Sequence, residues 1–399
     1  MFGTVGAFMQ ATAQGWLVLV LTNSPALLGL AGAAAGAPTL LIAVFAGVLA
    51  DRLDRRRLLV ATNLASAACA ATLAVLTTTG TVEFWHVVAL AFLAGVALTI
   101  QMPASQAVVS SIVDRTSIGN AVALNSAQYN LGRIVAPAVA GILIAEGGIA
   151  LGFWVNAVAL AIVAVLLAGL AIPHERDLDR VQAALWRDLQ DGIRHVAADR
   201  VLAVLVLLPA VPALFVLNYI TFIPVYARDI LGIGPIGLGL LTGSIGVGAL
   251  FGAVSLATLR PSGGSGRLLL AGLAVGGASL LTFAVSRSVP LSMAALAILG
   301  TCQVMYYSTT NTLIQVLVPA RLRGRVLSLY LLTSIGLIPV ANLVGGAVAD
   351  AVGVPAVLAF GGAITIATVG GVALAEPRLG RLRAAMIARE AMAEREAAA

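Results

Sequence analysis

The amino-acid sequence predicts an all-α integral membrane protein whose twelve transmembrane helices form two pseudo-symmetric six-helix bundles. Three observations predict this class. Hydrophobic residues make up 60% and charged residues 10% of the 399 residues, a composition unlike that of soluble globular domains. Apolar stretches long enough to cross about 30 Å of hydrocarbon recur along the whole chain. The arginines gather in every second gap between these stretches.

Each apolar stretch is near or above the roughly 20 residues that a helix needs to span a bilayer. In chain order the stretches are residues 3–22, 26–50, 58–79, 86–113, 119–145, 149–172, 201–226, 235–258, 268–286, 290–318, 324–349 and 354–375. The longest gap with arginines separates six stretches from six. The predicted domains are therefore a first bundle (1–172), a connector (173–200), a second bundle (201–375) and a tail (376–399).

The positions of the arginines predict the orientation of the chain in the membrane. All 23 basic residues are arginine, and all but Arg133, Arg228 and Arg287 lie on one side, in alternate gaps, the connector and the tail. Because cytoplasmic loops carry an excess of positive residues, we expect both termini in the cytoplasm and the protein in the plasma membrane. The net charge of +6 is then explained by arginines that border membrane spans, and we expect no nucleic-acid partner.

The residue types that the chain lacks argue against several functions. Without lysine it cannot supply the lysine of a phosphate-binding loop or of a Schiff base, so we expect no direct use of ATP. Cys69 and Cys302 lie inside apolar stretches, and we expect no disulfide, metal or cofactor. A membrane enzyme is a less favoured alternative, because His86, His174 and His195 match no metal-ligand spacing.

The connector is predicted to contain an amphipathic helix at the membrane surface. Its apolar residues recur at helical spacing, while charged residues occupy the other faces. The apolar positions are Leu185, Leu189, Ile193 and Val196, and the charged ones are Arg187, Asp188, Asp191 and Arg194.

The two halves resemble each other at an offset of 205 residues. The matching pairs lie around a helix, a short inner loop and a second helix: Val113 and Val318, Gly119 and Gly324, Gly141 and Gly346, and Gln106 and Asn311. Together with the six-plus-six division, these pairs favour an internal duplication. Duplicated membrane bundles commonly form transporters with the substrate site between the repeats.

Several motifs give the chain a resemblance to the major facilitator superfamily, and within it to the drug and siderophore exporter branch that includes macrolide and enterobactin efflux proteins. Residues 47–57 are similar to the superfamily loop G-x-L-A-D-R-x-G-R-R. Residues 103–141 resemble the exporter branch, and residues 319–330 look like the equivalent inner loop of the second half. The resemblance implies a monomeric secondary transporter that exports a small amphipathic compound by alternating access, coupled to protons. An importer or facilitator and a non-transporting receptor are alternatives.

The two inner loops supply candidate gate residues. Gly47 lets two helices approach each other, and Asp51 ends a helix beside arginines. Charge pairs between such residues can hold two domains together in one state. Ordinary positive-inside flanking is the alternative explanation. The gate residues are Gly47, Asp51, Arg52, Arg55 and Arg56, with Arg323, Gly324 and Arg325 in the second half. Asp54 departs from the motif, which has glycine there, so a different local turn is expected.

Arg133 is the only charged side chain near the middle of a predicted stretch. An arginine at that depth costs roughly 2.5–3.5 kcal/mol on insertion scales, so it should face the bundle interior or a wet cavity. It can anchor an anionic or polar substrate group. It can equally cross-link helices through backbone carbonyls or through Gln101 or Gln106.

Amide and phenol side chains at comparable depth are the other candidate substrate contacts. The resemblance implies that segments 1, 4, 7 and 10 line the central cavity, and polar groups should avoid lipid. As a set they predict a polyspecific pocket with weak polar contacts, although each one alone fits helix-to-helix packing equally well. They are Gln10, Gln14, Gln101, Asn125, Gln128, Asn218, Tyr219, Gln303, Tyr306, Tyr307 and Asn311.

Two further features bear on movement and coupling. Pro209 and Pro212 in segment 7 and the glycines of segment 8 are expected to allow bending and close packing. No aspartate or glutamate lies in the middle of a predicted stretch, so proton coupling is implied only by the resemblance.

Overall fold

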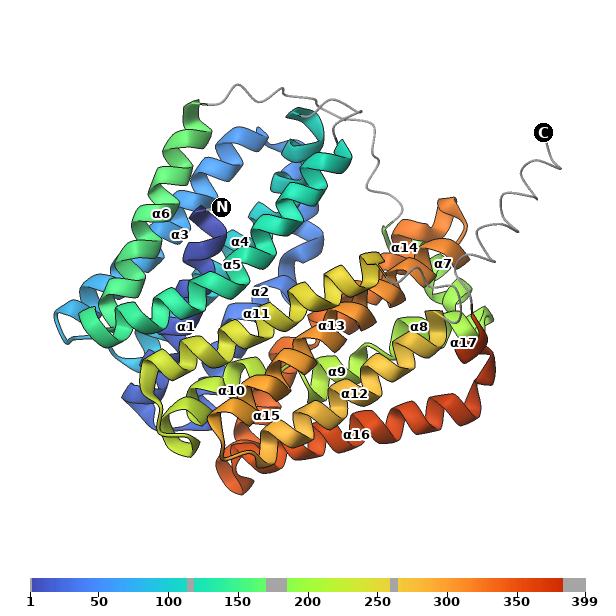
Figure 1. Ribbon diagram of the computed structural model, residues 1–399. Coiled ribbons are helices and arrows are strands. Elements are labelled where there is room, and N and C mark those ends of the chain that lie inside the picture. Colours follow the sequence, from blue (N-terminus) through green and yellow to red (C-terminus); the bar gives the residue numbers. More distant parts are fainter. Residues whose placement is uncertain (1, 113–117, 170–184, 259–264, 383–399) are drawn as a thin grey trace. The chain divides into compact units, whose positions relative to one another are not determined.

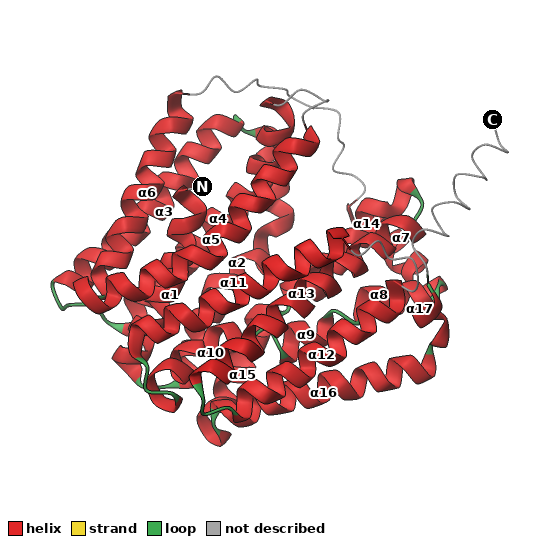
Figure 2. Ribbon diagram, in the orientation of Figure 1, coloured by secondary structure: helices red, strands yellow, loops and turns green. Residues whose placement is uncertain are grey.

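The computed structural model describes residues 2–112, 118–169, 185–258 and 265–382. Within these residues all regular secondary structure is helical (Figure 2). Eleven helical stretches there are long and apolar enough to cross a membrane. A twelfth, α5 (Ile118–Gly147), has 30 residues and is therefore also long enough to cross. The all-helical fold class predicted from the sequence is confirmed.

The helices of the first half begin and end within a few residues of the predicted stretches. Besides α5, they are α1 (Phe2–Thr22), α2 (Pro25–Arg52), α3 (Arg55–Thr78), α4 (Phe84–Ile112) and α6 (Ile149–Gly169) (Figure 1). Short polar side chains fix their starts. Ser24 Oγ accepts a hydrogen bond from the Leu27 amide at 3.3 Å, with Pro25 in the first turn of α2. Asp54 caps α3 by accepting from the Arg57 amide at 2.8 Å, which gives the residue that replaces the motif glycine a structural role.

The second half contains helices that are interrupted as well as continuous ones. Segment 7 is divided into α8 (Arg200–Leu207), α9 (Ala210–Phe215), α10 (Tyr219–Val225) and the π-helix η2 (Tyr226–Ile230), and segment 11 into α14 (Ala320–Leu331), the π-helix η3 (Leu332–Gly336) and α15 (Ile338–Val352). The other helices are α7 (Leu185–Ala198), α11 (Gly234–Thr258), α12 (Ser265–Val285), α13 (Val289–Leu317), α16 (Val354–Ala375) and α17 (Pro377–Arg381).

The first break in segment 7 falls where proline was expected to bend the helix. Pro209 separates α8 from α9, and Pro212 lies in α9, which ends at Phe215. Proline lacks the amide hydrogen that continues a helix, so the backbone hydrogen bonds are interrupted at these points. The helix α7 within the connector is confirmed over Leu185–Ala198, and its position at a membrane surface stays a prediction.

The described helices form two compact units that differ from the predicted bundles. Unit 1 combines residues 1–181 with 220–246 and 339–354, and unit 2 combines 182–219, 247–338 and 355–399. Two of the boundaries lie next to helix interruptions, one at the first residue of α10 and the other at the first residue of α15. Parts of segments 7, 8 and 11 therefore pack with the first half. The six-plus-six domain division remains a prediction from the sequence.

Small side chains allow close helix packing inside unit 1. Helix α2 packs on α4, α3 on α4 and α6, and α1 on α5 and α6. A Cβ added to Gly95 of α4 would overlap the carbonyl oxygen of Ala35 in α2. The hydroxyls of Thr39 and Thr99 join the same two helices at 3.1 Å. Approach at small residues is the usual way in which membrane helices gain packing contacts.

Unit 2 has a continuous apolar core. Leu205 of α8, Leu269 of α12, Leu313 of α13 and Val326 of α14 are each fully buried within it. Helix α7 packs on α14, where a Cβ on Gly192 would come 3.2 Å from Cβ of Arg325. The connector helix is therefore attached to the inner-loop region of the second half.

Candidate substrate site and gates

Unit 1 joins helices of the first half to parts of the second half at one end, which we call the joined end. It lies around the short connections at residues 23–24, 148, 231–233 and 353. Two helix contacts, the α2·α15 seam and the α5·α11 seam, hold it together. Both are built on glycines, and each is described in turn.

At the α2·α15 seam two helix backbones touch. A Cβ on Gly29 would overlap the carbonyl oxygen of Asn342 and lie 2.9 Å from Cα of Gly346. A Cβ on Gly346 would lie 2.9 Å from the carbonyl oxygen of Pro25. Side chains larger than hydrogen do not fit at either position unless the helices separate.

Polar groups reinforce the α2·α15 seam. Ser24 Oγ donates a hydrogen bond to Asp350 Oδ1 at 3.0 Å, and the Ala26 amide approaches the same oxygen at 3.5 Å. The carboxylate thus lies at the N-terminus of α2, where the helix dipole favours negative charge. Deeper in unit 1, Thr221 Oγ1 of α10 donates to Asn342 Oδ1 of α15 at 3.0 Å.

Arg228 of η2 provides another link to the first half. Its Nη1 donates to the carbonyl oxygen of Leu19 at 2.7 Å, and its Nη2 donates to Asn23 Oδ1. Its Nε also pairs with Asp229 at 2.5 Å. A residue outside the predicted cytoplasmic arginine clusters thus binds the end of α1.

The α5·α11 seam repeats the glycine geometry without a described ion pair or side-chain hydrogen bond across it. A Cβ on Gly141 would lie 2.5 Å from the carbonyl oxygen of Pro235 and 3.3 Å from Cα of Gly239. A Cβ on Gly239 would lie 2.6 Å from the carbonyl oxygen of Pro137. Gly141 and Gly346, which match at the offset of 205, therefore occupy equivalent seams.

Gln10 was predicted as a substrate contact, and the structure gives it a helix partner. Its Oε1 accepts a hydrogen bond from Nδ2 of Asn156 in α6, and both side chains are buried. The Oδ1 atom of Asn156 is buried with no hydrogen-bond partner among the described residues. Sequence reasoning missed Asn156, although a lone asparagine in the most apolar helix was a visible signal.

The other polar candidates of unit 1 lie on three helices. Gln14 is half-buried on α1, Gln101 on α4, and Gln128 and Arg133 on α5. The carbonyl oxygen of Arg133 would lie 3.0 Å from a Cβ on Gly246, so this residue borders the α5·α11 seam. The side chain of Asn125 lies outside the described part of the structure.

Phenols of α13 meet the interrupted helices of unit 2. The Tyr307 hydroxyl donates to the carbonyl oxygen of Ser334 in η3 at 3.4 Å, and the Tyr330 hydroxyl donates to the carbonyl oxygen of Tyr307 at 3.2 Å. The rings of Tyr306 and Tyr307 are 4.9 Å apart and tilted. The Tyr307 hydroxyl therefore donates a hydrogen bond to the irregular backbone of η3. The Tyr306 hydroxyl has no such partner among the described residues.

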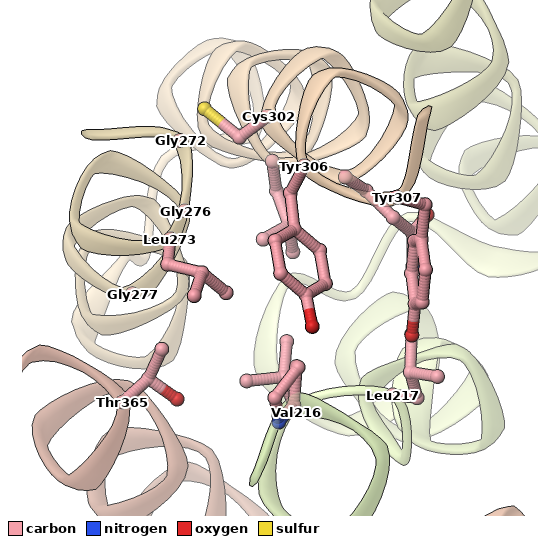
Figure 3. A pocket seen from close by; sticks show the side chains of 13 residues that line it. Val216, Leu217, Gly272, Leu273, Gly276, Gly277, Cys302, Tyr306, Tyr307 and Thr365 are labelled. Atoms are coloured by element: carbon pink, nitrogen blue, oxygen red, sulfur yellow. The ribbon is translucent and has the colours of Figure 1, made fainter. Parts of the chain in front are cut away.

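Tyr306 projects into a cavity between α9, α12, α13 and α16, which we call the Tyr306 niche (Figure 3). Its walls include Val216, Leu273, Gln303 and Thr365. The cavity has a volume of about 30 Å³, which is room for about two water molecules. The structure thus brings Gln303, Tyr306 and Tyr307 together at one site.

The remaining candidates of the second half are separate from the niche walls. Asn218 and Tyr219 are buried at the turn between α9 and α10, where Oδ1 of Asn218 has no hydrogen-bond partner among the described residues. Asn311 accepts a hydrogen bond from Gln315 one helical turn further along α13. Asn218, unlike Asn311, keeps a buried acceptor available.

The structure describes the predicted inner gate only in part. Gly47 lies within α2, but its surroundings and the side chains of Asp51 and Arg52 are outside the described part of the structure. Arg55 and Arg56 are half-buried in the first turn of α3, and Gly324 is exposed on α14 with no atom within 4 Å of an added Cβ.

Two arginines of α14 have described surroundings. Arg325 forms an ion pair with Asp191 of α7 at 2.9 Å. Arg323 has a buried Nε without a hydrogen-bond partner in the described part of the chain. The latch itself stays a prediction.

The helices and seams define the class of protein. All-helical packing with close glycine crossings and interrupted helices is typical of secondary transporters. Residues 1–399 match the model of the family described as transmembrane secretion effector, and the chain belongs to that family of the superfamily. It is a multi-pass membrane transporter of small molecules rather than an enzyme.

Several characterised relatives are efflux or siderophore transporters by name. The multidrug efflux pump Tap of Mycolicibacterium fortuitum is 28% identical over 352 residues, which cover 86% of this chain and 85% of that pump. The pump of the same name from Mycobacterium tuberculosis is 26% identical over 398 residues, or 96% and 92% of the two chains. The staphyloferrin A transporter of Staphylococcus aureus is 31% identical over 142 residues, 35% of this chain and only 36% of that transporter.

Solved structures share the fold. A bacterial homolog of the human lysosomal transporter Spinster, in an inward-facing and occupied conformation, has a TM-score of 0.74 at 14% identity and covers 96% of both chains. A D-xylose-proton symporter has a TM-score of 0.70 at 15% identity, covering 92% of this chain and 95% of the symporter. At these identities the likeness concerns the fold alone.

Proposed function

We propose that this transporter exports a small amphipathic compound, such as a drug, an antibiotic or a siderophore, by alternating access in exchange for protons. The observation that carries the export proposal is the near-full-length similarity to multidrug efflux pumps, over 86% and 96% of this chain. Neutral and amphipathic compounds fit the polar candidates, which are amides and phenols with a single arginine among them.

The joined end supports alternating access. Ser24, Asp350 and Arg228 link helices of the two sequence halves with hydrogen bonds that can break without unfolding a helix. The glycine seams beside them present complementary backbones and no bulky side chains. Such contacts can separate and re-form as units, which is how packed helix interfaces switch between two states.

We place the joined end at the outer face. The connections at this end carry few arginines, whereas the connector and tail carry many, so the positive-inside rule puts both termini in the cytoplasm of a plasma-membrane protein. In this orientation the joined end closes the route to the outside, and its opening releases the substrate there. We propose that one chain is sufficient for transport, since each seam forms within a single chain.

Proton antiport is the proposed source of energy. The chain has no lysine for a phosphate-binding loop, so an ion gradient is the simplest drive. The described carboxylates of the membrane-spanning helices lie near helix ends, and Asp350 is the one that links α15 to α2. Its charge therefore bears directly on the contact that must open.

The first experiment measures drug accumulation in an efflux-deficient host that makes the protein. We expect lower accumulation of at least one compound in a chemically broad panel, and we expect a protonophore to abolish the difference. Arg133→Ala should weaken export of some compounds if this arginine contacts substrate. Higher accumulation in place of lower would establish import, the alternative direction, and unchanged accumulation with correctly inserted protein would refute transport of these compounds.

A second experiment tests alternating access directly. On a background with Cys69→Ala and Cys302→Ala, Ser24→Cys and Asp350→Cys place two thiols across the α2·α15 seam, where the native oxygens are 3.0 Å apart. Joining them by oxidation or by a short bis-thiosulfonate should stop transport, and a reductant should restore it. The matched controls are Ser24→Cys alone, Asp350→Cys alone and the reduced double variant, which separate loss of the carboxylate from the effect of the cross-link. Full transport by the cross-linked protein would contradict the proposed opening of the joined end.

A further inference from the structure

The Tyr306 niche has an unusual chemical composition for a cavity among transmembrane helices. Most of its walls are apolar, formed by Val216, Leu273 and Leu299 together with glycines of α12. None of its lining residues is acidic or basic. Figure 3 shows the phenol oxygen of Tyr306 pointing into the open space between α9, α12 and α16.

The Tyr306 hydroxyl is a buried donor without an acceptor in hydrogen-bond geometry among the described residues, although the side chain of Thr310 also interacts with its phenol. The residue is 2% exposed, and its oxygen has no hydrogen-bond partner among the described residues. Thr310 donates to the backbone carbonyl of Tyr306 at 2.9 Å, and Thr365 donates to the carbonyl oxygen of Gly361 at 2.7 Å. Buried hydroxyls normally find a partner, so this one is suited to an acceptor that enters the niche.

We propose that the Tyr306 niche is a subsite for the uncharged tip of the exported compound, a small group that carries a carbonyl, ether or nitro oxygen. The oxygen accepts a hydrogen bond from Tyr306, and the apolar part of the tip contacts Val216 and Leu273. This inference rests on the proposed export function. It adds a selection rule, namely that the tip is neutral.

The selection rule follows from the cost of burying charge. A cationic group in the niche would lose its hydration and meet no carboxylate among the lining residues. A neutral acceptor loses less hydration and gains a donor that is already in place. Compounds that are cationic throughout must therefore bind elsewhere in the transporter, and changes in the niche should leave them unaffected.

The glycines of α12 allow the niche to be filled without disturbing the fold. A Cβ on Gly276 would meet Cβ of Cys302 at 3.4 Å and Leu299 Cδ1 at 3.6 Å, which are ordinary contact distances. Gly277 is unsuitable, because its Cβ would lie 2.9 Å from the carbonyl oxygen of Gly362. Gly370 of α16 has no atom within 4 Å of an added Cβ and provides a control position.

The test compares two probes on the full-length protein in lipid nanodiscs and proteoliposomes. Chloramphenicol is neutral and carries carbonyl and nitro oxygens, whereas tetraphenylphosphonium is a cation without an oxygen. We expect Tyr306→Phe to raise the Kd for chloramphenicol about two- to tenfold, the worth of one neutral hydrogen bond, and to leave that for tetraphenylphosphonium unchanged. Gly276→Ala should act in the same direction by filling the niche, and Gly370→Ala should affect neither probe.

The outcomes separate this inference from the proposed function. If the wild-type protein lowers accumulation of these compounds and yet neither Tyr306→Phe nor Gly276→Ala changes chloramphenicol binding, the niche assignment is overturned and export stands. Equal weakening of both probes, or wild-type binding of tetraphenylphosphonium without chloramphenicol, also overturns it. If the wild-type protein neither binds nor transports either compound, the export proposal fails for this chemistry and the subsite fails with it.

Discussion

The α2·α15 and α5·α11 seams are both close helix contacts at glycines, but their side-chain interactions differ. Gly346 and Gly141, 205 residues apart, each allow a helix to touch its neighbour. Only the α2·α15 seam adds a carboxylate, since Asp350 binds Ser24 and approaches the N-terminus of α2. Glycines at the two positions matched in the predicted repeat allow the packing at both seams, whereas the polar link recorded among the described residues lies at the α2·α15 seam. Release at the joined end should therefore depend mainly on the α2·α15 seam.

Among the seam variants, Gly29→Val is expected to reduce export the most. Its side chain would overlap backbone atoms of Asn342 and approach Gly346, which no rotamer change relieves. Overpacking of this kind costs roughly 1–3 kcal/mol, so export from proteoliposomes should fall about tenfold or more. Gly370→Val on α16 is the matched control. Wild-type export by Gly29→Val would show that the seam does not need to close.

Gly141→Val tests whether the second seam matters as much. The nearest atom to its Cβ is the carbonyl oxygen of Pro235 at 2.5 Å, in the first turn of α11 beside the short 231–233 connection. This turn can shift more readily than the middle of a helix, so we expect a loss of about fivefold, corresponding to roughly 1 kcal/mol. Export rates under the same conditions as for Gly29→Val decide the order. A larger loss than for Gly29→Val would reverse the ranking of the seams.

Asp350→Asn isolates the charge at the α2·α15 seam. The amide oxygen can still accept from Ser24, but the hydrogen bond is no longer charge-assisted and the helix dipole no longer meets a negative group. We expect about a two- to tenfold shift away from the closed joined end, the equivalent of roughly 0.5–1.5 kcal/mol. Spin labels at Thr79→Cys and Val352→Cys, two exposed residues of unit 1, on the cysteine-free background, should report a broader distance distribution. Identical distributions for both proteins would remove Asp350 from the gate.

Arg228→Gln should have a smaller effect at the same end. The variant loses the bonds to the carbonyl oxygen of Leu19 and to Asn23, both at a partly exposed site. Exposed charged contacts typically contribute less than about 1 kcal/mol, so export should change less than about fivefold. Rates measured in low and high salt provide the check, because the wild-type advantage should shrink as salt screens the arginine. A loss as large as that of Gly29→Val would make this arginine a principal lock.

Asp191→Asn tests a contact that does not belong to the joined end. It removes the ion pair between α7 and Arg325, which is partly exposed and has an N···O distance of 2.9 Å. Such pairs are worth about 0.2–1 kcal/mol, and we expect export to stay within about twofold of wild type. Thermal stability measured beside the export rate separates loss of folding from loss of gating. A severe loss of export in stable protein would instead indicate that the connector takes part in switching.

Much of the fold followed from the sequence. The starts and ends of α1, α2 and α16 lie close to the apolar stretches, because hydrocarbon thickness sets a minimum length for any crossing helix. Pro209 and Pro212 correctly indicated bending in segment 7. The π-helix η3 in segment 11 ends three residues before Pro339, which lacks the amide hydrogen that would bond to the carbonyl oxygen of Ile335, and the sequence analysis did not use this signal.

The candidate site was less predictable than the fold. Tyr306, Tyr307 and Gln303 were selected for their depth and do meet at one cavity. Gln10 was selected by the same rule and instead pairs with Asn156, 146 residues away. Depth in the membrane limits where a polar group can point, but it does not identify the partner on another helix.

The sequence by itself determined where this protein is apolar, how long each crossing segment must be and where bending is easiest. These properties depend on the cost of moving each segment from water into hydrocarbon, which is a sum over neighbouring residues. Only the tertiary structure decided that Gly29 meets Gly346, that Asp350 reaches Ser24 and that Tyr306 faces a cavity. Those contacts depend on distances between helices far apart in the chain, and no local property of the sequence specifies them.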